Sequence, residues 1–243
     1  MTPKPLEAAL ARLMREAHEA PARLVPADLD RVRALAGDGA LEYALVVGTF
    51  HNVNRVADLL HVDPELPGMP WLRRVEPLRR GAVRMMSLLL GRMDLAPRAY
   101  DRSFDEAVTT LPETVDRAAL APLRARPHLV EAFGLMLAER QQSSLDHATL
   151  ARVAAVVEAA LPSSMDDMQG FHARPADPVD DFAFVGTRYA YRTTVGMIDA
   201  LRARGYDDLG LLDLATAVAS ANEWARLWRL LGLPPALFSL SAA

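Results

Sequence analysis

Apolar residues recur at steps of three and four positions along almost the whole chain, which is the spacing of amphipathic α-helices. The pattern predicts helices over residues 5–19, 27–36, 40–61, 71–93, 113–124, 127–141, 146–160, 180–204 and 209–231. The segment 40–61 is apolar on most of its sides, so we expect it to lie at the centre of the fold.

The composition also favours helices over strands. Hydrophobic residues make up 51% of the chain and aromatic residues only 6%; Leu and Ala dominate, and Ile198 is the single isoleucine. Strands prefer β-branched and aromatic residues, so the predicted fold class is all-α. The 243 residues contain no linker rich in Gly, Ser or Pro, which predicts a single domain over residues 1–243.

Charge and terminal sequence narrow the classes of partner. The formal net charge of −4 disfavours a polyanion, so no nucleic-acid partner is expected. A local group of basic residues is interpreted as surface arginines, with an anion-binding patch as the alternative: Arg73, Arg74, Arg79, Arg80 and Arg84. No apolar run reaches about 18 residues and no signal peptide is visible, so we expect a cytoplasmic protein without a membrane partner.

Two distant stretches of the chain resemble each other. Residues 59–64 match residues 230–235 at an offset of 171, and the same offset places Arg55 on Arg226. This similarity predicts two repeats, over residues 25–66 and 126–235, whose long helices pack against each other.

Several segments, in order, resemble the alkylhydroperoxidase D-like and carboxymuconolactone decarboxylase-like family. Residues 50–62 are similar to the end of the long helix in its peroxidase-related members, residues 126–133 to the helix before its active-site helices, and residues 150–155 to the approach to its redox turn. The resemblance implies a two-repeat helical fold. Together with the apolar helix over 40–61, it also implies a homo-oligomer.

The redox motif of that family is altered in this chain. Met165-x-x-Met168-x-x-x-His172 has the spacing of the family's Cys-x-x-Cys-x-x-x-His, and the chain contains no cysteine. The family's upstream glutamate falls on Val153. Thiol peroxidase chemistry needs a thiolate that becomes a sulfenic acid and a second thiol that resolves it. A thioether can do neither, so we predict that the protein is not a thiol peroxidase.

Acid–base chemistry remains open to the other side chains of this region. His172 is a candidate base, and Asp166 and Asp167 are candidate orienting carboxylates, with His51 as a further catalytic candidate. The structural alternative places Asp166 in the first turn of a helix after Ser163-Ser164, and His172 on a backbone carbonyl at a helix end.

Three residues of the altered motif would share one helical face if the helix were continuous. Met165, Met168 and His172 would then suit Cu(I), but Gly170 interrupts the helix and methionine at this spacing usually fills a core, so neither a metal nor a cofactor is predicted. His51 and Arg55 lie four residues apart on the long apolar helix, where they either form a polar network between the repeats or line a pocket. Met165, Met168 and Arg55 are the candidate substrate contacts.

Two classes of function follow. The first is a cofactor-independent lyase or isomerase that acts on a small molecule through His172 and His51. The second is a catalytically silent scaffold that binds a small molecule or a protein. Converging polar groups in a pocket beside Met165, Met168 and His172 would favour the first class, and a solid core filled by methionine would favour the second.

Overall fold

The computed structural model describes residues 4–61, 101–111, 115–170 and 172–234. The chain divides into two compact units, residues 1–61 with 102–243 and residues 62–101, and the description that follows concerns the first. Every regular element among the described residues is a helix, which confirms the all-α class. The helix predicted over 71–93 and the group of arginines from Arg73 to Arg84 lie outside the described residues.

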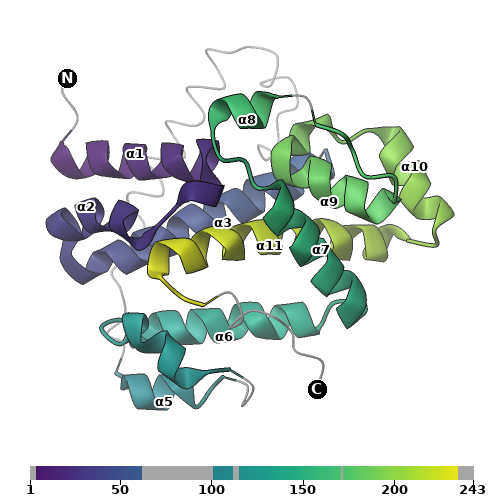
Figure 1. The fold of residues 1–243 in the computed structure, drawn as a ribbon. Helices are drawn as coiled ribbons and strands as arrows, with labels where there is room; N and C mark the ends of the chain where they lie inside the picture. The colour runs from purple at the N-terminus through teal and green to yellow at the C-terminus, as the bar shows by residue number, and fades with distance from the viewer. Residues whose placement is uncertain (1–3, 62–100, 112–114, 171, 235–243) are drawn as a thin grey trace, which may run out of the picture. The chain divides into compact units, whose positions relative to one another are not determined.

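The helices follow the apolar pattern closely (Figure 1). Their bounds are α1 (Pro5–Glu19), α2 (Pro26–Ala36), α3 (Ala40–Leu59), α5 (Phe104–Val108), α6 (Pro127–Gln141), α7 (His147–Ala160), α8 (Met165–Gln169), α9 (Pro178–Arg188), α10 (Val195–Ala203) and α11 (Asp208–Leu231). Side chains that accept a backbone N–H at the first turn begin many of them: Ser103, Asp146, Ser164, Asp177, Thr194 and Asp207. Such caps each contribute about 1 kcal/mol.

The helices α3 and α11 pack along each other and carry the rest of the fold, with α7 and α9 against α11 (Figure 1). A glycine brings α9 close to its neighbours. A Cβ added to Gly186 would lie 2.8 Å from Cγ1 of Val218 and 2.9 Å from Cδ2 of Leu59. Any side chain at position 186 would therefore push α9 away from α3 and α11.

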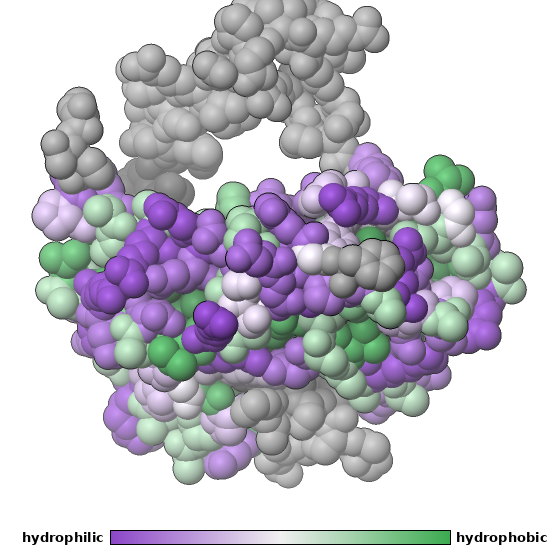
Figure 2. All heavy atoms as spheres, turned by 45° about the horizontal axis from the view of Figure 1, so that its top comes forward, coloured by the Kyte–Doolittle hydropathy of each residue, from purple (hydrophilic) through white to green (hydrophobic). Residues whose placement is uncertain are grey.

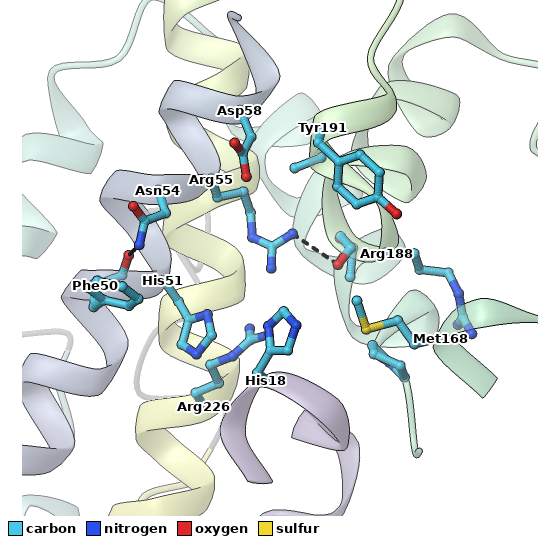
Figure 3. Close-up of a pocket in the computed structure, with 13 residues that line it drawn as sticks. His18, Phe50, His51, Asn54, Arg55, Asp58, Met168, Arg188, Tyr191 and Arg226 are labelled. Atoms are coloured by element: carbon cyan, nitrogen blue, oxygen red, sulfur yellow. Dashed lines mark hydrogen bonds between the residues drawn. The ribbon is translucent and has the colours of Figure 1, made fainter. Parts of the chain in front are cut away.

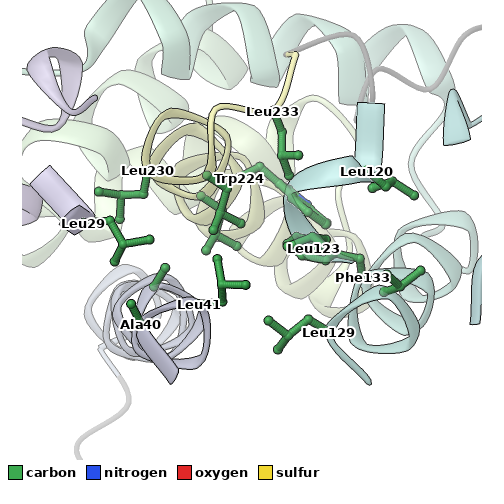
Figure 4. Packing of buried hydrophobic residues seen from close by; sticks show 14 of the residues in the cluster. Leu29, Ala40, Leu41, Leu120, Leu123, Leu129, Phe133, Trp224, Leu230 and Leu233 are labelled. Carbon is green, nitrogen blue, oxygen red and sulfur yellow. The ribbon is translucent and has the colours of Figure 1, made fainter. Parts of the chain in front are cut away.

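Buried apolar side chains form two clusters. The first joins α1, α2, α3, α5 and α6 to the C-terminal half of α11, where the rings of Phe133 and Trp224 stack with centroids 5.4 Å apart (Figure 4). The second joins α7, α9 and α10 to the N-terminal half of α11, around Phe182 and Leu214. Fully burying one such side chain contributes about 1.5–3 kcal/mol, so both ends of α11 are firmly held.

Two predicted helices are wrong in detail. The segment 180–204 is not one helix, because α9 ends at Arg188, a 3₁₀ turn follows at Ala190–Arg192, and Thr194 caps the start of α10 through the N–H of Met197. The segment 113–124 contains a 3₁₀ helix, Arg117–Leu123, and no α-helix in its described part. Pro122 lies inside it and has no N–H to donate.

The surface of α3 is more exposed than the sequence predicted. One side packs on α11, but Val46, Phe50 and Val53, which follow helical spacing, are each more than half exposed. On the face shown in Figure 2, polar residues predominate and hydrophobic residues lie between them in small groups. Among the described residues, none of the helices combines the length and the apolar character needed to cross a bilayer.

Candidate functional site

The short helix α8 contains the altered redox motif. Its N-cap, Ser164, accepts the backbone N–H of Asp167 at 3.0 Å, while the carboxylate of Asp167 accepts the N–H of Ser163 at 2.7 Å and its hydroxyl at 3.1 Å. Residues Met165 to Met168 thus form the first turn of a helix, with Asp166 and Asp167 at its positive end, which matches the structural alternative for Asp166.

The carboxylate of Asp167 is also bound by a buried arginine. Nη2 of Arg188 donates to Oδ1 and to the carbonyl oxygen of Asp167, and Nη1 donates to the carbonyl of Ala160 at 2.9 Å. The hydrogen bonds from Ser163 and Arg188, against the opposing effect of desolvation, lower the pKa of Asp167 to about 2. Asp167 therefore fastens α8 to α7 and α9 and is occupied by that role.

His172 lies beyond the end of α8. The helix ends at Gln169, so His172 does not share its face with the methionines. Nε2 of His172 instead lies 2.7 Å from the carbonyl oxygen of Asp167 and 2.7 Å from Nη2 of Arg188. One ring nitrogen cannot both donate to a carbonyl and accept from a guanidinium, so the tautomer selects one of the two bonds. This arrangement matches the structural alternative for His172.

A cavity of about 190 Å³ lies between α1, α3, α8, α11 and the turn after α9 (Figure 3). We call it the His51 cavity. Its ionisable side chains are His18, His51, Arg55, Asp58, Arg188 and Arg226, and its apolar and aromatic ones are Phe50, Pro162, Met168, Ala190 and Tyr191.

Two stacked imidazoles line this cavity. The rings of His18 and His51 lie 6.0 Å apart and within 7° of parallel. Burial, followed by the charges of Arg226 and Arg55, lowers the pKa of His51 to about 2, and the same causes lower the pKa of His18. His51 is therefore neutral at pH 7. Its Nε2 is buried and has no hydrogen-bond partner in the described part of the chain.

Arg226 is a buried cation without a carboxylate partner. Its residue is 1% exposed, Nε donates to the carbonyl of Ala17 at 2.9 Å, and Nη1 donates to the carbonyl of Asn222 at 2.7 Å and to its side-chain oxygen at 3.3 Å. All these acceptors are neutral, and Nη2 donates no bond within the described residues. Burial lowers the pKa of Arg226 well below its ordinary value. An uncompensated charge in such a place is costly.

Arg55 enters the same cavity from α3. Nη1 donates to the carbonyls of Gly186 and Thr187, while Nε is buried without a partner among the described residues. Burial lowers the pKa of Arg55 to about 10, against the opposing charge of Asp58. The charge of Arg188 is balanced by Asp167. The guanidiniums of Arg55 and Arg226 remain, and Asp58 is the one carboxylate among the described lining residues, so the cavity is electropositive.

A second cavity, of about 310 Å³, lies on another side of α3 and α11. Its lining includes Asn52, Asp213 and Glu223; Glu223 accepts hydrogen bonds from Asn52 at 2.7 Å and from Thr49 at 3.1 Å. Helix α11 thus places a basic group, Arg226, in one cavity and two acidic groups, Asp213 and Glu223, in the other. No group of three His, Cys, Asp or Glu side chains within the described ranges is arranged to hold a metal ion.

The sequence-predicted site residues divide into two groups. His51, Arg55 and Met168 line the His51 cavity, whereas Met165, Asp166, Asp167 and His172 do not. Sequence reasoning missed the roles of three lining residues, His18, Arg188 and Arg226. A signal existed for Arg226, which the internal similarity pairs with Arg55.

Comparison with protein-family models, with curated proteins and with solved structures finds no match for this chain.

Proposed function

We propose that the protein binds a small molecule in the His51 cavity without transforming it. One observation carries this proposal: Arg55 and Arg226 line the same partly open cavity with donors that make no hydrogen bond to described residues, and neither forms an ion pair with a carboxylate in the described part of the chain. Buried polar groups are normally satisfied, so a site of this kind is expected to be completed by a ligand.

We further propose that the scaffold is an alkylhydroperoxidase D-like fold of two repeats whose redox centre is lost. The capped turn at Met165–Gln169 supports the resemblance of its motif. The offset of 171 supports the repeats, because it relates Arg55 to Arg226 in one cavity and Asn52 to Glu223, which hydrogen-bond to each other. With no cysteine in the chain, such a protein is not a thiol peroxidase.

Acid–base catalysis is the second candidate, since two imidazoles line the cavity. A general base works best when its pKa lies near the working pH. The pKa of His51 is lowered to about 2, so it is a weak base at pH 7. Asp167 is bound by Arg188, Nε2 of His172 lies 2.7 Å from the carbonyl oxygen of Asp167, and neither residue lines the cavity. These features favour binding over proton abstraction.

A blocked cavity tests the proposal. Met168→Trp places an indole in the wall of the His51 cavity, and Met165→Trp makes the same change on the same short helix outside its lining. We expect a fragment library screened by saturation-transfer NMR to give hits with the wild type and with Met165→Trp that are lost with Met168→Trp. Hits that survive Met168→Trp, or a library without hits on the wild type, would contradict the proposed function.

A further inference from the structure

The donors left unused in the His51 cavity have a defined shape. In a guanidinium, Nε–H and one Nη2–H point the same way and form a fork that matches the two oxygens of a carboxylate. Nη1 of Arg55 donates hydrogen bonds to the carbonyls of Gly186 and Thr187. Its Nε and Nη2 make no hydrogen bond with described residues. The fork edge is the part of Arg55 that has no hydrogen-bond partner among the described residues.

We propose that the ligand of the His51 cavity carries a carboxylate, which binds the Nε–Nη2 edge of Arg55 beside Nη2 of Arg226. This inference rests on the proposed binding function and adds the chemical class of the ligand. Figure 3 shows Arg55 extending from α3 towards the space next to His18, His51 and Arg226.

The charges around the cavity favour an anion over a neutral ligand. Arg226 is buried and bonds only to neutral acceptors, so a carboxylate would supply the counter-charge that the described chain does not. Asp58 also lines the cavity, but it is exposed, and solvent screens its repulsion of an anion. His51 adds a buried, unpaired Nε2 to the same wall.

The rest of the cavity accommodates an apolar body. Phe50, Met168 and Tyr191 supply aromatic and thioether surface. An engineered cavity of about 150 Å³ holds benzene, so about 190 Å³ is sufficient for an aromatic acid of one ring. Benzoate and benzamide are therefore a suitable pair of probes, because they have nearly the same shape and differ in charge.

Isothermal titration calorimetry of the wild type with each probe is the first arm of the test. We expect benzoate to bind at least about 10-fold more tightly than benzamide, since hydrogen bonds to a charged group are worth about twice as much as neutral ones. Equal or tighter binding of benzamide would overturn the carboxylate inference while leaving the proposed binding function intact. Absence of binding by benzoate would also overturn the inference, and the fragment screen decides the binding function separately.

Variants of Arg55 form the second arm. Arg55→Gln removes charge and fork, Arg55→Lys keeps the charge without the fork, and Arg202→Gln removes one exposed charge of α10 outside the cavity lining. We expect the dissociation constant of benzoate to rise about 10- to 100-fold in Arg55→Gln, less in Arg55→Lys, and not in Arg202→Gln. Unchanged affinity in both Arg55 variants would overturn the assignment of the fork.

Discussion

Burial of His51 predicts a loss of stability in mild acid. In the folded protein the pKa of His51 is lowered to about 2, whereas an unfolded chain has the ordinary value of 6.5. Between these two values the unfolded state binds a proton that the folded state does not. The free energy of unfolding therefore falls as the pH drops below about 6.5, and it is independent of His51 above that pH.

The size of the effect follows from the difference in proton binding. Each pH unit below the pKa of the unfolded chain costs 1.36 kcal/mol, so moving from pH 7 to pH 5 removes roughly 2 kcal/mol through His51. The pKa of His18 is lowered for the same reasons, so His18 acts in the same direction. A loss of this size is a large part of the stability of a typical domain.

Urea unfolding at pH 7 and pH 5 measures this loss. We expect His51→Gln to remove roughly 2 kcal/mol of the pH-dependent loss. A matched control, His147→Gln, replaces an exposed histidine at the start of α7 and should retain the wild-type pH dependence. If wild type and His51→Gln lose equal stability between pH 7 and pH 5, His51 is not held neutral by burial in the folded protein.

Four further predictions concern packing, the motif and assembly. Asp167→Asn should lower the unfolding free energy by about 2 kcal/mol in urea titrations, because buried Arg188 loses its carboxylate partner. Gly186→Ala should cost about 2 kcal/mol through contact with Val218, whereas Gly196→Ala, with nothing closer than 3.9 Å, should be neutral or stabilising by up to about 1 kcal/mol in thermal unfolding. Peroxidase assays with organic hydroperoxides and a dithiol should show no multiple turnover without metal; sustained turnover would contradict the loss of the thiol cycle. Light scattering at micromolar concentration should give a mass above that of one chain, and a single monomer mass would contradict the predicted homo-oligomer.

Most helices were predictable because the three- and four-residue spacing of apolar positions agrees with the faces that the helices bury in the fold. The predicted bounds 5–19 and 127–141 match α1 and α6 residue for residue. The interruption between α9 and α10 was missed because the apolar period continues across it. The side chain of Thr194 caps a new helix, α10, at this point. Threonine before an apolar run is so common that the sequence alone does not show whether a helix begins there.

The site was predictable only in part, because distant elements build the cavity. His51 and Arg55 could be paired from their spacing on one helix. His18 comes from α1 and Arg226 from α11, and no local pattern shows that these side chains meet. Conversely, Asp167 and His172 have the residue types of a catalytic pair, but a buried arginine on another helix binds the carboxylate of Asp167, and Nε2 of His172 lies against the Asp167 carbonyl and that arginine.

A crystal structure of the protein grown with benzoate would show whether the His51 cavity holds a small carboxylate ligand. We expect benzoate in that cavity, with its carboxylate on Nε and Nη2 of Arg55 and its ring against Phe50 and Met168. Benzoate bound elsewhere, such as in the cavity beside Glu223, with only water in the His51 cavity, would show that this cavity is not a carboxylate site.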